Sequence, residues 1–146
     1  GEDAKHPAIR GGGLGDGGAH YGMICDASFP TYLLTRWVRD AQPGDRLDLS
    51  RAIKSLTYDT STLVGLWDRG VIKRGCKADI NIIDYDWLSL HAPIVVNDLP
   101  AGGRRMRQKA DGYVANIVSG EVTYRGGVST GARPGRLIRG GAKSRA

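Results

Sequence analysis

Apolar residues in the first part of the chain recur at helical spacing. In "FPTYLLTRWVRDA" they fall three and four positions apart, which places them on one face of a predicted helix over residues 29–41. Asp26 or Ser28 can cap the start of this helix, and Pro30 fits its first turn. Pro43-Gly44 then ends it.

A second helix is predicted from Leu49, with Asp48 as its N-cap. Its apolar positions recur on one face and are expected to form a buried stripe: Leu49, Ala52, Ile53 and Leu56. Thr57 can cap a further short helical turn that reaches Leu66. This part of the chain is therefore expected to be helical.

After Gly70 the pattern changes to short apolar and β-branched runs, which predict strands. "ADINIID" predicts a strand over 79–84. "GYVANIVSGEVTYRGG" predicts a hairpin whose strands, 113–118 and 121–125, flank a turn at Ser119-Gly120. Gly126-Gly127 is expected to close this hairpin.

The segment between these strands is less regular. Ile94 to Val96 predicts one strand, and the residues that follow it are expected to form a loop. Four acids near the predicted strands are expected to serve as turn and cap residues: Asp79, Asp84, Asp86 and Asp98. A sheet of so few strands needs a partner sheet or a covering layer. The chain is therefore expected to be the closing part of a larger structure.

Composition fits a globular protein. The chain has 146 residues, 40% of them hydrophobic and 25% charged. No apolar run approaches the roughly 20 residues of a membrane span, and Gly1 to Arg10 lacks the apolar core of a signal peptide. Cys25 and Cys76 belong to no CxxC and are expected to be reduced, small buried side chains. The protein is therefore expected to be cytoplasmic, and because the first residue is glycine its start is expected upstream.

The net charge of +6 comes mostly from the C-terminal tail. Residues 133–146 hold five basic residues and no acid, and without them the 21 basic residues fall to 16, against 15 acidic ones. Such a tail can bind a polyanion, although a solvated terminus is the simpler interpretation. No aromatic residues alternate with these arginines, which argues against binding of single-stranded nucleic acid.

The stretch "GGGLGDGGAH", Gly11 to His20, carries the candidate chemistry. Part of it matches GxGxxG, but a dinucleotide site needs a strand directly before the motif and a helix directly after it. The predicted helix starts only near Phe29, and Asp16 would repel a pyrophosphate. A carboxylate between glycines fits instead a catalytic loop at the carboxyl end of a barrel strand, where it can bind a divalent metal and accept a proton from water.

The sequence from this loop onward resembles a known family. "LGDGGAHYGMICDASFPTYLLTRWVRD" is similar to the last barrel strand and following helix of the N-acyl-D-amino-acid deacylases, in the amidohydrolase superfamily. The likeness continues through "GLWDRGVIKRGCKADINIID" and "STGARPGRLIRG" and covers about residues 9–140. Dihydroorotases and hydantoinases share these motifs in looser form. This sequence departs from the family at Gly15, where serine is frequent, and at Ser61, which aligns with an alanine.

The resemblance implies an α/β fold, the C-terminal fragment of a metal-dependent (β/α)8 barrel hydrolase with strands of the accompanying small β-sandwich. Residues 1–70 would end the barrel, 71–132 would contribute to the sandwich, and 133–146 would form a basic tail. "GGRR", Gly102 to Arg105, would cover the barrel or approach the active site, and its arginine forks suit carboxylates.

The resemblance also implies zinc, and a metal-activated water that attacks the amide of an N-acylated amino acid. Asp16 matches the family's acid that contacts the metal, accepts the proton of that water and passes it to the leaving amine. His20 follows the family pattern, and it either contacts the substrate or holds the loop.

The other metal ligands of the family have no counterpart in this chain. A catalytic zinc needs about three protein ligands, and the chain has only His6, His20 and His91, with no HxH. We therefore expect the chain to need the remainder of the barrel and to be inactive alone. Three alternatives stay open: a hydrolase of cyclic amides, a homologue that has lost its metal, and a non-catalytic module whose tail binds a polyanion. A homo-oligomer could cover the unpaired strand edges.

Overall fold

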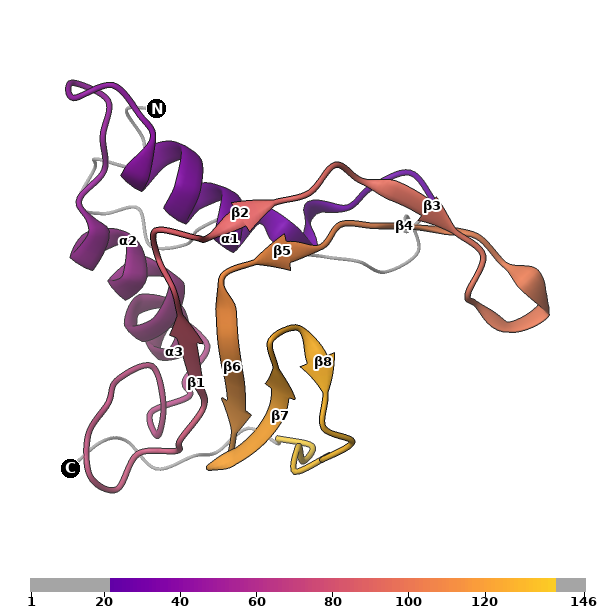
Figure 1. Cartoon of the computed structure of the whole chain (residues 1–146). Helices are drawn as coiled ribbons and strands as arrows, with labels where there is room; N and C mark the ends of the chain where they lie inside the picture. Colours follow the sequence, from indigo (N-terminus) through magenta and orange to yellow (C-terminus); the bar gives the residue numbers. More distant parts are fainter. Residues whose placement is uncertain (1–21, 139–146) are drawn as a thin grey trace.

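The computed structural model describes residues 22–138. Helices come first along the chain, strands follow, and a two-stranded arm extends away from both (Figure 1). Asp16 and His20 lie outside the described residues. None of the helices in the described range is long and apolar enough to cross a membrane.

The first helical run has three continuous parts: a 3-10 turn η2 (Asp26–Ser28), the α-helix α1 (Phe29–Tyr32) and a π-helix η3 (Leu33–Arg39). The predicted helix over 29–41 is thus confirmed except at its end, because the run stops at Arg39, before Pro43-Gly44 is reached. Pro30 lies in its first turn as expected. The predicted caps are wrong, because neither the Asp26 nor the Ser28 side chain caps the helix. The Ser28 hydroxyl is taken up by Gln108, 80 residues away.

The second helical run comprises α2 (Leu49–Lys54), a π-helix η4 (Ser55–Asp59) and α3 (Thr60–Leu63). Asp48 caps it as predicted, since its carboxylate accepts a hydrogen bond from the Arg51 amide at 2.8 Å. Thr57 starts no new helical turn. It lies inside the run, where its hydroxyl donates to the Ile53 carbonyl at 2.7 Å.

The predicted stripe of the second helix is only half buried. Ala52 is 4% exposed and Leu56 packs against the core, whereas Leu49 and Ile53 remain 41% and 39% exposed. The spacing placed these residues on one side of the helix correctly, but the described elements cover only part of that side. The apolar remainder faces outward.

The main sheet is antiparallel, with the strand order β1-β6-β7-β8. Its strands are β1 (Ile80–Ile83), β6 (Tyr113–Val118), β7 (Glu121–Arg125) and β8 (Val128–Ser129). The first three confirm the predicted strand and hairpin. Gly126-Gly127 does not end the sheet, because the chain turns there into β8.

The turn between β6 and β7 uses left-handed backbone at both central residues. Ser119 has φ 53° and Gly120 has φ 83°, the signs that a tight two-residue hairpin requires. Asp79 accepts a hydrogen bond from the Ser119 amide at 2.8 Å, so its predicted turn role is confirmed. Asp84 also meets expectation, accepting from the Trp87 amide at 3.3 Å.

The arm is formed by two antiparallel strand pairs in succession. Its elements are β2 (Ser89–Leu90), β3 (Ile94–Val96), the short 3-10 turn η5 (Pro100–Gly102), β4 (Arg105–Arg107) and β5 (Ala110–Asp111). β2 pairs with β5 and β3 pairs with β4. The predicted strand at Ile94 is confirmed, but the loop expected after it is wrong. β4 has only one apolar residue between two arginines, so its pairing with β3 left no hydrophobic signal.

The core lies between the helices and the start of the sheet. Its buried residues come from η3, α2 and the connection after β1: Leu34, Val38, Ala52 and Leu88. Gly112 is essential to this packing, because it has φ +92° and an added Cβ would lie 2.6 Å from the Leu88 Cα. The chain can therefore pass against Leu88 only with glycine at this position.

Both cysteines are free, as expected, but neither is buried. Cys25 lies at the start of the first helical run. Cys76 lies in a turn closed by a hydrogen bond that its backbone N–H donates to the Lys73 carbonyl at 3.0 Å. Their small side chains thus occupy connecting segments, and the prediction of two core cysteines is wrong.

Candidate functional site

The predicted catalytic loop joins the described structure at Gly22. Asp16 and His20 lie outside the described residues, so their roles stay predictions. The described chain nevertheless shows what flanks this loop. Cys25 and Ser28 follow Asp16 by nine and twelve positions, and both contact the arm.

Gln108 connects the segment after the loop to the base of the arm. Its Oε1 lies 2.5 Å from the Ser28 hydroxyl and 4.0 Å from the Cys25 sulfur. Its Nε2 donates to the His91 carbonyl on the opposite strand at 2.8 Å. In Figure 1 the indigo segment that leads into the first helix runs beside the arm. One side chain therefore holds both arm strands against the chain that leaves the Asp16 loop.

His91 is paired at the base of the arm. Its Nε2 lies 2.8 Å from Asp111 Oδ2, and both side chains are about half exposed. Within residues 22–138, no three His, Cys, Asp or Glu side chains gather closely enough to hold a metal ion. The described residues therefore do not fit a complete zinc site, and further ligands would have to come from elsewhere in the protein.

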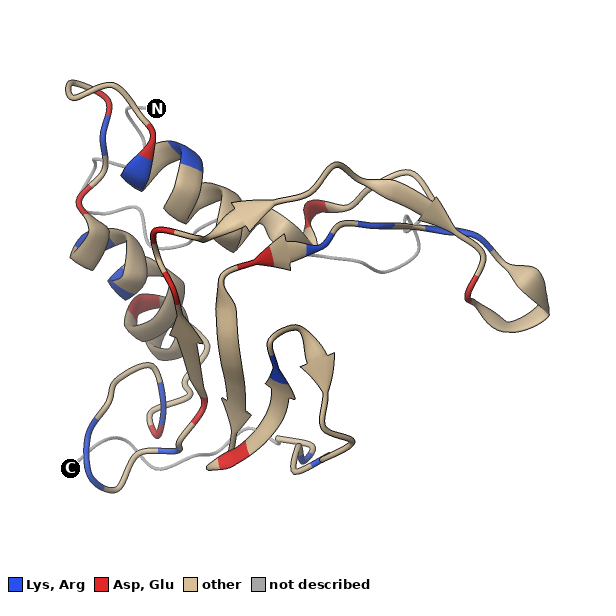
Figure 2. Ribbon diagram, viewed as in Figure 1, with Lys and Arg blue, Asp and Glu red and all other residues tan. Residues whose placement is uncertain are grey.

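The arm carries a charged face on β4. Arg105 donates to both carboxylate oxygens of Asp98, from Nε at 2.6 Å and from Nη2 at 2.8 Å. This hydrogen bonding lowers the pKa of Asp98 below its ordinary value. Arg107 lies two residues further along the strand, and its Nη1 is 3.9 Å from Asp98. Figure 2 shows the resulting basic stretch along one strand of the arm.

The junction between helix and sheet is fixed by Arg39. Its Nη1 donates to the carbonyl groups of Leu88 at 2.8 Å, Tyr85 at 2.9 Å and Asp86 at 3.3 Å. The hydrogen bonds that Arg39 donates to Asp40 raise the pKa of Arg39, and burial raises the pKa of Tyr85. These groups are structural. Sequence reasoning missed them because the partners are separated by more than 40 positions.

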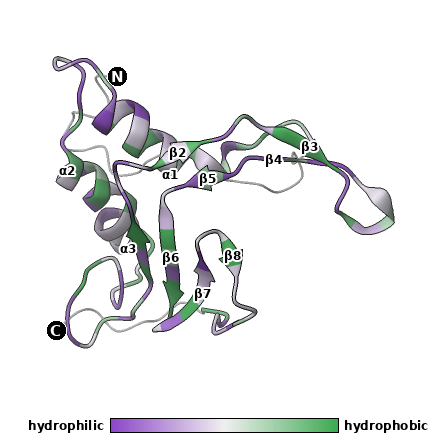
Figure 3. Ribbon diagram, in the orientation of Figure 1, coloured by the Kyte–Doolittle hydropathy of each residue, from purple (hydrophilic) through white to green (hydrophobic). Residues whose placement is uncertain are grey.

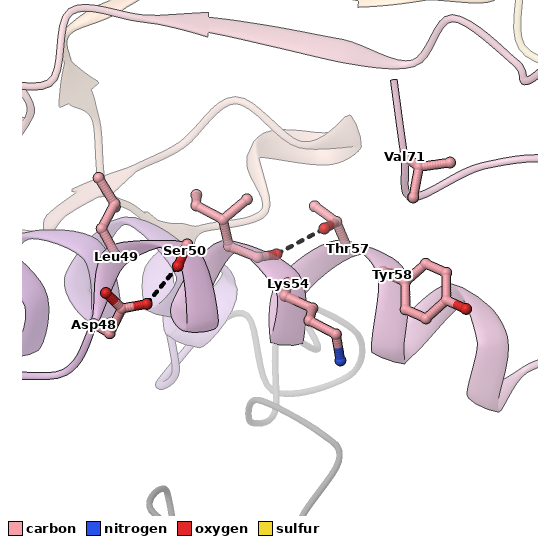
Figure 4. A pocket seen from close by; sticks show the side chains of 9 residues that line it. Asp48, Leu49, Ser50, Lys54, Thr57, Tyr58 and Val71 are labelled. Carbon is pink, nitrogen blue, oxygen red and sulfur yellow. Dashed lines mark hydrogen bonds between the residues drawn. The ribbon is translucent and has the colours of Figure 1, made fainter. Parts of the chain in front are cut away.

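A shallow groove of about 740 Å³ lies along the second helical run. It is lined mainly by apolar groups, among them Leu49, Ile53, Tyr58 and Val71 (Figure 4). Its polar side chains are engaged within the helix: Asp48 caps α2 and Lys54 pairs with Asp59. The groove thus offers an uncovered apolar surface and no evident reactive group.

Other apolar side chains are exposed along the described chain. Several lie on the arm and in the sheet, including Ile82, Ile94, Val95, Leu99 and Val114 (Figure 3). Exposed apolar surface on this scale is typical of a surface that another part of a protein covers.

Comparison with known proteins places these features in a family. A family model described as "Amidohydrolase family" matches residues 9–124. The match includes the Asp16 loop, both helical runs, the arm, β6 and most of β7. No match was found among the curated proteins or among the solved structures.

Proposed function

Because the chain belongs to the amidohydrolase family, we propose that it is the C-terminal part of a metal-dependent hydrolase that deacylates N-acyl-D-amino acids. The observation that carries this proposal is Asp16. It lies in a glycine loop inside the family match, and the first helical run follows it. The resemblance of this loop and of the later motifs to the deacylases supports the substrate class.

Asp16 is proposed as the general base. It would accept a proton from the attacking water and deliver it to the amine that leaves when the amide bond breaks. Zinc, when bound, would supply the activation of that water. His20 follows Asp16 by four residues and would contact the substrate or hold the loop.

The remaining metal ligands would come from upstream barrel strands of the same protein. His91 is not a promising ligand, because it is paired with Asp111 and has no third ligating side chain beside it in the described range. The uncovered groove on α2 supports this arrangement, since Leu49 and Ile53 would pack against the missing part of the barrel. The strands β1, β6, β7 and β8 would join the small β-sandwich.

The test is an Asp16→Asn substitution in the protein expressed with its encoded upstream sequence and supplied with zinc. Acetate release from N-acetyl-D-leucine is expected to fall by at least about 100-fold, because the isosteric amide cannot accept the proton. The variant's circular dichroism should match that of the wild type.

Two outcomes would contradict the proposal. Near-normal turnover by the variant would exclude Asp16 as the base. Wild-type enzyme that hydrolyses hydantoin or dihydroorotate, and leaves N-acetyl-D-leucine intact, would assign the chain to the cyclic-amide branch. N-acetyl-L-leucine serves as the control for stereochemical preference.

A further inference from the structure

The outer edge of β3 has no partner strand among residues 22–138. β3 pairs with β4 on one side, and no described strand lies on its other side. Its side chains are apolar and β-branched, and Ile94 and Val95 are 48% and 64% exposed. Figure 3 shows β3 as a hydrophobic segment on the arm. An exposed apolar strand edge is a template for pairing with another strand.

Charge distinguishes the two outer edges of the arm. β4 carries Arg105 and Arg107 on either side of Met106 (Figure 2). A second β4 laid antiparallel against it would therefore place arginines directly opposite one another, which is unfavourable. Ile94–Val96 contains no charge, no proline and no bulge, the features that usually protect an edge strand. Pairing is thus disfavoured along β4 and open along β3.

The side chains of β3 suit pairing with a second copy of the same strand. In an antiparallel pair centred on Val95, this residue lies opposite its own equivalent, and Ile94 lies opposite Val96 of the second copy. Met106 is the neighbour of Val95 on β4, so the two copies together form a continuous apolar row. The β4 arginines remain at the outer margins of the combined sheet. An apolar centre with a charged margin is the usual arrangement of a protein interface.

The position of the arm also favours a second molecule as the partner. In Figure 1 β3 and the groove on α2, which is assigned above to the upstream barrel, lie on opposite sides of the molecule. Gln108 holds the base of the arm through its contacts with Ser28 at 2.5 Å and with the His91 carbonyl at 2.8 Å. β3 lies further out along the arm than these contacts. It is therefore presented on a fixed base, which lowers the entropic cost of pairing.

We propose that β3 is a self-association edge, through which two copies of this protein pair antiparallel and join their arms into one four-stranded sheet. The two-fold axis passes beside Val95. Each copy contributes a strand of three residues, so the contact is smaller than the roughly 800 Å² per partner of a standard interface. The dimer is accordingly expected to be reversible, and it does not depend on the proposed substrate.

Disulfide trapping in the full-length protein, with oxidised glutathione, tests the register. Val95→Cys places two thiols opposite each other, with Cα atoms about 4.5–5.5 Å apart, within reach of a disulfide. Ile94→Cys is the matched control on the same strand, because its equivalents would lie more than about 7 Å apart. The covalent dimer of Val95→Cys is expected to form at least about tenfold faster than that of Ile94→Cys. The wild type gives the background from Cys25 and Cys76.

Sedimentation velocity of the full-length protein measures the association itself. The wild type is expected to shift from monomer to dimer as its concentration rises to about 100 μM. Val95→Lys places two like charges opposite each other and is expected to remain monomeric with an unchanged Tm. Val128→Lys is the control, since Val128 is 70% exposed on the outer strand of the main sheet, and it should dimerise like the wild type.

Three outcomes would overturn the self-association edge. Equal trapping of the two cysteine variants would exclude the register centred on Val95. A dimer that survives Val95→Lys would place the interface elsewhere on the protein. A monomeric wild type, with a lowered Tm in Val95→Lys, would show that another segment of the same chain covers β3.

Discussion

At the junction of η3 with the β1–β2 connection, Leu88 is fully buried and Arg39 donates to three carbonyl groups. On the arm, Val95 is 64% exposed and Arg107 has a buried donor without an acceptor among the described residues. The junction is therefore closed by contacts within this chain, whereas the arm leaves apolar side chains and one buried donor uncovered among the described residues. Stability and function should accordingly respond to different substitutions.

The largest effect on stability is expected at Gly112, inside the junction. Gly112→Ala would place a methyl group 2.6 Å from the Leu88 Cα and 2.9 Å from the Asp84 carbonyl oxygen, at φ +92°. Since the backbone would have to move, the free energy of unfolding should fall by about 3 kcal/mol or more. Urea denaturation monitored by tryptophan fluorescence measures this change.

Gly127→Ala is the control for Gly112→Ala. Gly127 also has a positive φ, +76°, but an added Cβ would meet nothing within 4 Å. Only backbone strain remains, so the loss should be about 1 kcal/mol. Equal losses at the two glycines would show that the close packing on Leu88 is not what fixes the junction.

A smaller loss is expected when the junction keeps its packing and loses its hydrogen bonds. Arg39→Met retains an unbranched side chain but removes the donors to the Tyr85 and Leu88 carbonyl groups. The free energy of unfolding should fall by about 2 kcal/mol, because partly buried acceptors lose a charged donor. The same denaturation experiment applies.

Asp40→Asn separates the contribution of the Arg39 contacts with carbonyl groups from that of the neighbouring ion pair. Asp40 pairs with Arg39 at 2.8 Å, and its side chain is 49% exposed. An exposed pair contributes little, so the loss should stay below about 1 kcal/mol. If Asp40→Asn were as damaging as Arg39→Met, the ion pair and not the carbonyl contacts would stabilise the junction.

The difference between the junction and the arm also explains how far the sequence could predict the structure. β1, β6 and β7 are rich in apolar and β-branched residues, and their strands were predicted correctly. β4 was missed, because an Arg-Met-Arg strand is defined only by its register against Ile94 to Val96. Leu49 and Ile53 were expected to be buried, since periodicity gives the apolar side of a helix but not what covers it.

The candidate site likewise has residues that a local motif reveals and residues that only the fold brings together. Asp16 and His20 were found from a local motif, and their placement lies outside the described residues. Arg107 was not singled out from the sequence. Its position becomes informative only once the structure shows that Arg105 donates to both oxygens of Asp98 and that Gln108 contacts Ser28. Contacts that span 80 positions leave no signal in a single sequence.

The smallest effect on overall stability is expected on the arm, at Asp98. Asp98→Asn removes the paired hydrogen bonds with Arg105 at 2.6 and 2.8 Å. The midpoint of global unfolding should not move, because the arm contributes nothing to the buried core. Hydrogen exchange of the β3 and β4 amides should become faster, while that of β6 stays unchanged. Slower folding or a shifted midpoint would place the arm within the cooperative unit.

The pH dependence of the arm follows from the same pair. The Arg105 hydrogen bond lowers the pKa of Asp98 below the ordinary value of an aspartate, which the unfolded chain keeps. The pair therefore stabilises the arm fully above about pH 4, and this contribution is lost as the pH falls through the lower pKa of the folded state. In NMR spectra the Arg105 Nε–H signal should stay constant from pH 7 to about pH 4 and shift only at lower pH. Asp98→Asn should abolish that transition. A transition between pH 7 and pH 5 would contradict the assignment to Asp98, because that carboxylate stays ionised over this range.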